Sequence, residues 1–169
     1  MADLTAHRTD TPLGPFTILA DGEVVRASGF TTSVEQLARL AGVALDAVAV
    51  SGEDHPALAA VREYFGGEVA AIDRVKTMDK PRTGPFTVVA RHALRDIPAG
   101  TTHTYSELAI AAGNPKAVRA AGSACATNPT ALFVPCHRVT RTDGSLGGFL
   151  YGLDVKRALI EHEAKYAAA

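Results

Sequence analysis

The chain has 169 residues, enough for one large domain or two small lobes with a sizeable core. Hydrophobic residues make up 47% and charged residues 21%, which excludes a disordered chain. The sequence contains no run of about 18 apolar residues, so no membrane span is predicted. The formal net charge of −1 indicates no nucleic-acid partner by itself, while two cysteines are too few for a disulfide scaffold and predict a cytoplasmic protein.

The first predicted elements are a hairpin and a helix. The dipeptide Asp21-Gly22 separates the apolar segments 16–20 and 23–28, which is a strong short-range hairpin signal. Thr32 followed by Glu35 then forms a capping-box pattern, and apolar residues repeat with helical period before Gly42. We therefore expect two strands followed by a helix.

A second helix and one more strand complete the predicted N-terminal lobe. Pro56 opens the helix, and Gly66-Gly67 end it. Residues 69–79 are predicted to form a strand. The turn-rich segment 80–85 then marks the lobe boundary, giving predicted domains of residues 1–82 and 83–169.

The charge balance changes close to this boundary. Residues 1–75 contain 5 Lys/Arg and 11 Asp/Glu, whereas residues 76–169 contain 12 and 7. Such asymmetry hints at a second half that binds a polyanion. An ordinary fluctuation of charge along the chain explains it as well.

The second lobe is predicted to be helical. Apolar residues in 86–94 have the spacing of an amphipathic helix. Thr104 and Glu107 form another capping box, and the next helix ends at Gly113. Asn114 as N-cap and Pro115 as first helical residue are predicted to start a helix that runs to about residue 126.

Two short helices joined by a tight turn match a helix-turn-helix, although a plain αα-corner is common. Beyond them, an apolar extended run leads into Cys136, and Asp143-Gly144 predict a turn. Residues 147–152 form a glycine-rich loop, after which Asp154 is expected to cap a final helix that contains Glu163.

The segment Pro135-Cys136-His137-Arg138 puts a thiol beside an imidazole and a guanidinium. Neighbouring bases and cations raise the thiolate fraction of a cysteine, and the thiolate is the nucleophile. Free cysteine is also among the residue types most often buried. Local chemistry therefore leaves a reactive thiol and a packed thiol about equally open.

With these residues placed, the chain resembles the O6-alkylguanine-DNA alkyltransferases over residues 86–163. The resemblance is carried by Thr104–Leu108, Gly113–Ala120, Asn128-Pro129 and Val134–Val139. It implies an α+β fold, with a ribonuclease-H-like antiparallel sheet plus helices in the N-terminal lobe and a helical lobe with a helix-turn-helix after it.

The resemblance also implies a reaction. Cys136 would take an alkyl group, usually methyl, irreversibly from O6-alkylguanine or O4-alkylthymine in flipped-out DNA, with a single turnover. His137 would act through a water molecule as the base, and Glu163 would orient His137. Tyr105 would help to rotate the nucleotide and would donate its hydroxyl towards guanine N3. No cofactor is implied.

Further residues are assigned by the same resemblance. Arg119 would fill the base stack that the target leaves, in minor-groove binding by a monomer with little sequence specificity. The expected DNA-contacting residues are Thr104, Lys116, Ala117, Arg119 and Ser123. The expected pocket residues are Val139, Phe149, Leu150 and Tyr151, Asn128 is the hinge, and Pro135 and Arg138 are structural.

Other readings remain at this point. A Cys–His hydrolase would need an oxyanion hole, for which no motif is present. A lesion-sensing helix-turn-helix protein would not need the cysteine. A zinc site on Cys125, Cys136 and His137 lacks an evident fourth ligand, and the N-terminal lobe has only His7 and His55, so we expect no metal.

Overall fold

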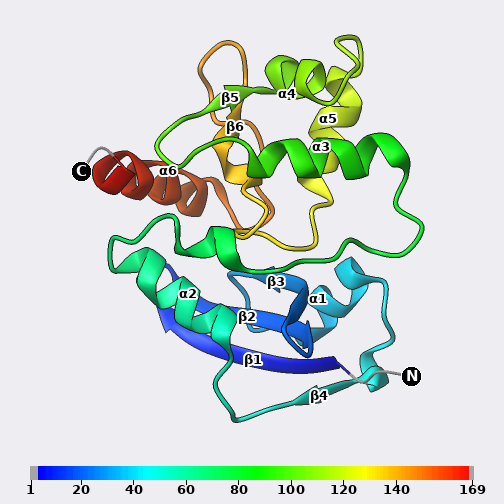
Figure 1. Ribbon diagram of the computed structural model, residues 1–169, viewed down its shortest axis with the longest axis vertical. Coiled ribbons are helices and arrows are strands. Elements are labelled where there is room, and N and C mark those ends of the chain that lie inside the picture. Colours follow the sequence, from blue (N-terminus) through cyan, green and yellow to red (C-terminus); the bar gives the residue numbers. More distant parts are fainter. Residues whose placement is uncertain (1–3, 168–169) are drawn as a thin grey trace. The chain divides into compact units, whose positions relative to one another are not determined.

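The computed structural model describes residues 4–167 and has an α+β fold, as predicted. The chain divides into two compact units. The N-terminal unit contains the residues up to 81 together with 129–133, and the C-terminal unit contains 82–128 and the residues from 134 onwards. Figure 1 shows strands in the first unit and mainly helices in the second.

A four-stranded sheet forms the centre of the N-terminal unit. Its strands are β1 (Leu4–Thr11), β2 (Gly14–Asp21), β3 (Val24–Gly29) and β4 (Val48–Val50). Their order is β3-β2-β1-β4, and only β4 runs parallel to its neighbour. The sheet is therefore mixed, which corrects the purely antiparallel sheet that the resemblance implied. The hairpin predicted at Asp21-Gly22 is confirmed, whereas β1 and β4 were not predicted.

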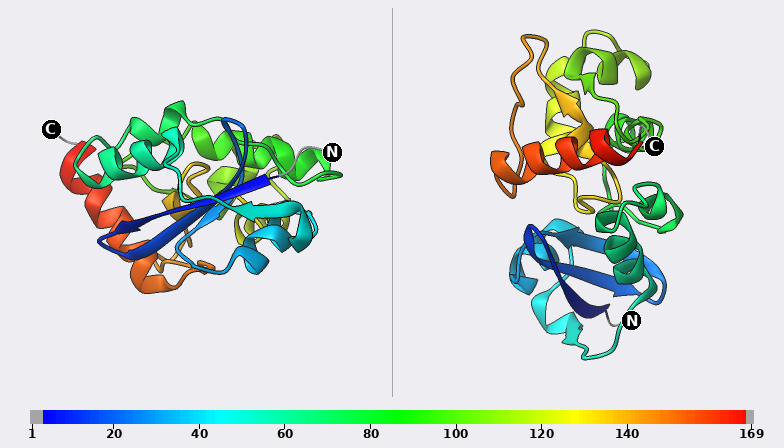
Figure 2. Two further views of the ribbon diagram at one scale, coloured as in Figure 1. Left: turned by 90° about the horizontal axis from the view of Figure 1, so that it is seen from below. Right: turned by 90° about the vertical axis from the view of Figure 1, so that its left-hand side faces the viewer.

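Helices cover both faces of this sheet, which explains why β2 is buried along Phe16–Ala20. Helix α1 (Val34–Ala41) packs on the face that carries Leu19 and Ala27, and α2 (Pro56–Phe65) lies along the opposite face (Figure 2). A short 3₁₀ turn, η1 (Leu45–Ala47), leads into β4.

The N-cap of α1 was predicted one residue too early. Ser33, and not Thr32, accepts the hydrogen bond from the Gln36 N–H. Thr31 and Thr32 precede the cap, and the Thr31 hydroxyl accepts from the Ser33 N–H, which closes a turn before the helix. Adjacent residues that can all cap a helix leave its start ambiguous in the sequence.

The strand predicted over residues 69–79 is wrong. Ala71–Arg74 form a 3₁₀ turn, η2, that packs on α2 with Ile72 fully buried. Only an isolated bridge between Thr77 and Val25 joins this segment to the edge of the sheet. Its apolar residues are therefore buried by a helical turn and not by strand pairing.

The C-terminal unit contains four helices and an apolar core. The helices are α3 (Pro85–Arg95), α4 (Tyr105–Ala111), α5 (Val118–Ala126) and α6 (Leu153–Ala167). The two-residue strands β5 (His103–Thr104) and β6 (Val139–Thr140) pair in parallel. The core includes Leu94, Leu108, Ala121, Val139 and the side chain of Cys136.

Helix starts in this unit agree only partly with prediction. The capping box of Thr104 and Glu107 on α4 is confirmed. Helix α5 begins at Val118, because Asn114 Oδ1 accepts from the Lys116 N–H and closes a turn before the helix, so Asn114 is not its N-cap. Asp154 lies inside the first turn of α6 and is not its cap.

No helix within residues 4–167 is long and apolar enough to cross a membrane. The same residues contain no group of three or more His, Cys, Asp and Glu side chains arranged to hold a metal ion. The rings of His7 and His55 lie 5.0 Å apart, but every ring nitrogen is already hydrogen-bonded within the N-terminal unit.

Candidate active site

The cysteine–histidine pair lies in a single 3₁₀ turn, η3 (Cys136–Arg138). The Cys136 N–H donates to Val134 O at 2.8 Å, and the Arg138 N–H donates to Pro135 O at 3.0 Å. Strand β6 follows at once and pairs with β5. The thiol therefore sits on a hydrogen-bonded turn anchored in a small sheet, not on a flexible loop.

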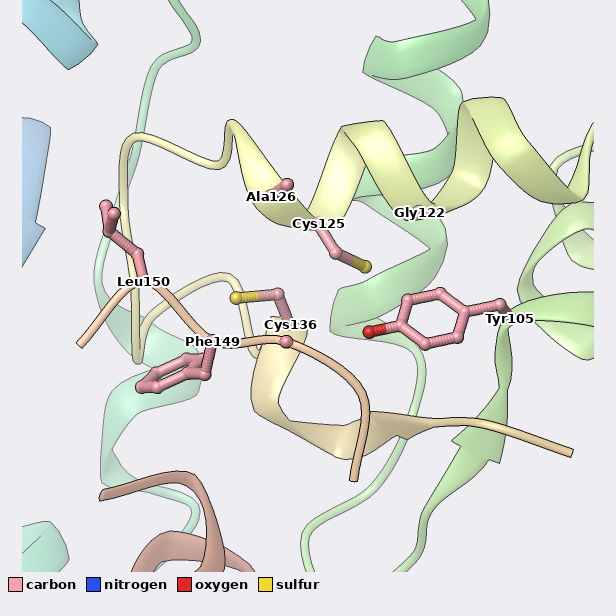
Figure 3. Close-up of a pocket in the computed structure, with 8 residues that line it drawn as sticks. Tyr105, Gly122, Cys125, Ala126, Cys136, Phe149 and Leu150 are labelled. Carbon is pink, nitrogen blue, oxygen red and sulfur yellow. The ribbon is translucent and has the colours of Figure 1, made fainter. Parts of the chain in front are cut away.

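A cavity of about 320 Å³ opens beside the Cys136 side chain. Helix α4, helix α5 and the loop before α6 wall it, through Tyr105, Gly122, Cys125, Ala126, Gly148, Phe149 and Leu150. Figure 3 shows the sulfur of Cys125 and the hydroxyl of Tyr105 on one side of Cys136, whose own sulfur is directed toward the side where Leu150 lies. The cavity thus combines apolar walls with a few polar atoms, as small-molecule sites do.

His137 and Glu163 form a buried pair behind the thiol. Nε2 of His137 lies 2.6 Å from Oε2 of Glu163, and both side chains are almost fully buried. Nδ1 of His137 is buried without a hydrogen-bond partner within residues 4–167. One ring nitrogen is thus fixed by the carboxylate, and the other can accept a proton.

Burial and the neighbouring charges set the protonation states of this pair. Burial lowers the pKa of His137 and outweighs the opposing effect of Glu163, so the imidazole is neutral at neutral pH. Burial alone raises the pKa of Glu163, but His137 and Arg138 together hold it well below its usual value. A neutral imidazole oriented by a carboxylate suits a general base.

Arg138 completes the environment of Glu163. Its Nε donates to Oε1 of Glu163 at 2.7 Å, one terminal nitrogen donates to Oε2 at 3.2 Å, and the other donates to Ile97 O at 2.7 Å. Its side chain is 2% exposed. Arg138 therefore neutralises the buried carboxylate and ties the turn to α6 and to the end of α3.

Asn128 links α5 to the active-site turn. Its Nδ2 donates to Val134 O at 2.9 Å, the same carbonyl that accepts from the Cys136 N–H. Its side chain also hydrogen-bonds the Cys136 thiol, which partly offsets the rise in the thiol pKa caused by burial. The predicted hinge residue therefore contacts both the turn and the thiol.

Tyr105 begins α4 and is half-buried in the cavity wall. Burial, with smaller effects from Cys125 and Cys136, raises the pKa of its phenol to about 12. The hydroxyl therefore remains protonated at neutral pH and can donate a hydrogen bond. A side chain at Gly147, whose φ is 74°, would collide with this ring, so the loop approaches Tyr105 closely only because residue 147 is glycine.

The residues predicted to contact DNA lie mostly on one exposed surface. Lys116, Arg119 and Ser123 are exposed, on α5 or just before it, and Ala117 is half-buried at the N-cap of α5. The Thr104 hydroxyl accepts the capping hydrogen bond of α4. Gly122, Cys125 and Ala126 of α5 line the cavity. Helix α5 therefore carries both exposed residues that are predicted to contact DNA and part of the cavity wall.

The predicted pocket residues occupy different positions. Phe149 and the half-exposed Leu150 line the cavity. Val139 is fully buried in the core of the C-terminal unit. Tyr151 packs edge-on against Phe149, with ring centroids 5.8 Å apart, and does not line the cavity.

Sequence reasoning missed Lys156, which is fully buried on α6. Its Nζ donates to the carbonyl oxygens of Val139 and Gly148, at 2.6 and 3.2 Å, and to that of Leu146. Burial lowers the pKa of Lys156, while Cys136 and Cys125 act to raise it. The sequence could have indicated that Lys156 is buried, because its spacing from Leu159 and Glu163 places the three residues on one face of α6.

Comparison with known proteins gives concordant matches. The family model described as "6-O-methylguanine DNA methyltransferase, DNA binding domain" matches residues 85–165. A methylated-DNA–protein-cysteine methyltransferase of Methanosarcina acetivorans is 35% identical over 156 residues, which cover 91% of this chain and 94% of that protein. The protein of the same name from Salmonella typhimurium is 34% identical and covers 96% and 97%.

Solved structures agree with these relatives. The crystal structure of Mycobacterium tuberculosis O6-methylguanine methyltransferase superimposes with a TM-score of 0.80 at 31% identity, covering 98% of this chain and 94% of that one. A structure of Mycobacterium tuberculosis OGT in complex with DNA gives a TM-score of 0.80 at 30% identity, covering 96% and 94%. The similarity thus extends over both units of the chain.

Proposed function

Because the chain belongs to the methylated-DNA–protein-cysteine methyltransferase family, it acts in DNA repair by alkyl transfer, and we propose that Cys136 is the acceptor. The observation that carries this assignment is the position of the Cys136 thiol, which opens on the cavity and has the His137–Glu163 pair behind it. A thiolate is a good nucleophile for an alkyl carbon, and the thioether product needs no hydrolysis step.

The proposed reaction balances without a cofactor. The Cys136 proton passes through a water molecule to Nδ1 of His137, and Glu163 stabilises the imidazolium. The sulfur then attacks the alkyl carbon on O6, forming the C–S bond as the C–O bond breaks. The departing guanine keeps the C–O electron pair and takes up the proton that His137 held, while the Tyr105 hydroxyl donates a hydrogen bond to its N3. The thiol proton thus ends on guanine and His137 is neutral again.

The target base is proposed to reach the cavity by flipping out of the duplex, because an atom inside a base pair cannot be attacked there. The arrangement of α5 supports this route. Arg119 and Ser123 lie on its exposed surface, while Gly122 and Cys125 line the cavity beside them. Arg119 would occupy the gap that the flipped base leaves in the stack.

We propose that the protein binds the minor groove as a monomer with little sequence specificity, and that O4-alkylthymine is a second substrate. A repair protein must act wherever the lesion occurs, which favours backbone contacts over base reading. The reaction also requires a reduced Cys136, which favours the cytoplasm.

Stoichiometry tests the proposed reaction. The protein is incubated with increasing amounts of duplex containing O6-methylguanine, and repaired bases and intact protein mass are measured together. We expect one repaired base and one added methyl group per protein molecule. Repeated turnover would favour a Cys–His hydrolase, and binding with no mass gain would favour a lesion sensor; either result contradicts the proposal.

A second experiment tests base flipping. Arg119→Ala should slow transfer from a duplex by about ten-fold or more, because unstacking costs a few kcal/mol, but should leave reaction with the free O6-methylguanine base unchanged. Lys165→Ala removes a cation from the exposed side of α6 and serves as the control. Equal slowing on both substrates would contradict the role of Arg119.

A further inference from the structure

Arg91 is a buried cation close to the active site that the proposed reaction does not use. It lies on α3 and is 5% exposed. A long charged side chain is seldom buried unless specific partners hold it. Its partners therefore show what the charge does.

The guanidinium of Arg91 holds the C-terminal end of α5. Its Nε donates to Ala124 O at 3.1 Å, and Nη2 donates to the Thr127 hydroxyl at 2.7 Å. That hydroxyl donates in turn to Ser123 O at 2.7 Å. The last carbonyls of a helix lack partners within the helix and carry partial negative charge, so a cation is favourable there.

Asn128 connects this end of α5 to the active-site turn. The Asn128 N–H donates to Cys125 O at 3.3 Å, and the Asn128 side chain donates to Val134 O at 2.9 Å. Val134 O also accepts from the Cys136 N–H. The backbone from Ala124 to Asn128, together with the hydrogen bonds of Asn128, thus connects the Arg91 contacts to the turn that carries the thiol, and Cys125 and Ala126 of this segment lie in the cavity wall.

We propose that Arg91 is a positioning residue for alkyl transfer: it fixes the end of α5, and through Asn128 it places and polarises the Cys136 thiol. This inference rests on the proposed function, because it takes Cys136 as the acceptor. It adds a residue of α3 to a site otherwise built from α4, α5, η3 and α6.

The charge of Arg91 acts in the same direction as its hydrogen bonds. Burial raises the pKa of the Cys136 thiol, and the charges of Lys156 and Arg91 act to lower it. The titratable groups that face this thiol are Arg91 from α3, Tyr105 from α4, Cys125 from α5, Lys156 from α6 and Tyr151 from the loop before α6. Only Arg91 and Lys156 among them are cations.

The test separates the charge of Arg91 from its hydrogen bonds. Arg91→Lys keeps the charge, Arg91→Gln keeps a donor without the charge, and Arg157→Gln removes a half-exposed cation of α6 as the matched control. Alkylation of Cys136 by iodoacetamide is followed against pH, with peptide mass mapping to separate it from Cys125. Transfer from O6-methylguanine duplex is measured on the same proteins.

We expect Arg91→Gln to move the alkylation midpoint to higher pH by about half a unit or more and to slow transfer at neutral pH at least about three-fold. Arg91→Lys and Arg157→Gln should keep the wild-type midpoint. A wild-type midpoint in Arg91→Gln overturns the proposal. Wild-type protein that alkylates normally but gains no methyl from DNA would defeat the proposed function instead.

A further variant keeps the proposal testable if Arg91→Gln does not fold. Thr127→Val preserves side-chain shape and the Arg91 charge but removes the acceptor of Nη2. It should slow transfer about three-fold or more, the order expected for one lost charge-assisted hydrogen bond. A wild-type transfer rate in folded Thr127→Val also overturns the proposal.

Discussion

The two compact units bury different kinds of polar side chain. Among the described residues, the buried polar side chains of the N-terminal unit are His7, Thr17, Ser28, His55 and Thr130. Those of the C-terminal unit are Arg91, Asn128, His137, Arg138, Lys156 and Glu163. Both units therefore bury imidazoles, but among the described residues only the C-terminal unit buries guanidinium, ammonium and carboxylate groups.

The buried polar groups of the N-terminal unit stabilise the fold, whereas those of the C-terminal unit fix the geometry of the candidate site. Polar groups in the N-terminal unit bond to backbone, as Ser28 does to Ala131 O and Thr17 to Thr31 O, and so complete the fold. Buried charges pay a desolvation penalty that their pairing only partly returns. Their concentration around Cys136 indicates that the C-terminal unit gives up stability to fix the geometry of its site.

The largest expected effect comes from breaking the buried charge cluster. Glu163→Gln leaves Arg138 buried without its counter-charge and should lower the free energy of unfolding by about 3–5 kcal/mol. Glu63→Gln breaks the exposed Glu63–Arg74 pair of the N-terminal unit and should cost under about 1 kcal/mol. Urea unfolding measures both. Similar losses would remove the contrast between the units.

Lys156 should give the next largest effect. Lys156→Met leaves the carbonyls of Val139, Leu146 and Gly148 without their shared donor and should cost about 1–3 kcal/mol. Amide hydrogen exchange should then rise in residues 141–150 but not in the sheet of the N-terminal unit. Lys156→Arg is the control that retains a donor. Unchanged exchange in the loop would show that Lys156 does not hold it.

The pH dependence of stability should also come largely from the C-terminal unit. The folded protein keeps His137 neutral, whereas the unfolded chain protonates it below a pH of about 6.5. The free energy of unfolding should therefore decrease as the pH is lowered below this value, by up to about 1.4 kcal/mol per pH unit. The lowered pKa of Glu163 extends the loss below about 4.5. His137→Gln should remove the first part of this slope, and an unchanged slope would contradict the assignment.

The smallest predicted effect concerns the N-terminal unit. The His55 ring accepts from the Ala57 N–H and so caps α2. His55→Ala should therefore cost about 1 kcal/mol, as the loss of an N-cap does, and should not alter transfer from duplex DNA once folded. Thermal unfolding and single-turnover rates measure the two quantities. A slower transfer by folded His55→Ala would show that the division of roles between the units is wrong.

Sequence predicted the elements whose signals are local. The hairpin at Asp21-Gly22, the helix after Pro56 and the capping box at Thr104 each depend on a few adjacent residues, and the structure contains all three. Strand β1 was missed because Leu4–Thr11 mixes charged and apolar residues without clear alternation, although it is a central strand. Strand β4 is too short to give a pattern.

In the candidate site too, sequence predicted the residues that have a strong local signal and missed those that lack one. Cys136 and His137 were found because they are adjacent in a distinctive motif, and Glu163 followed from the resemblance to a known family. The burial of Lys156 and Arg91 was not predicted, because lysine and arginine are almost always exposed, although the spacing of Lys156 from Leu159 and Glu163 was a local signal for one of them. Only the packing of those helices against the active-site turn shows their partners.

The central claim is that Cys136, and not the second thiol in the same cavity, accepts the alkyl group. Cys125→Ala and Cys136→Ala are each reacted with duplex containing O6-methylguanine, and the cysteine peptides are weighed. The account predicts one methyl on Cys136 in Cys125→Ala and none on any peptide of Cys136→Ala. A methylated Cys125 peptide in folded, DNA-binding Cys136→Ala would contradict it.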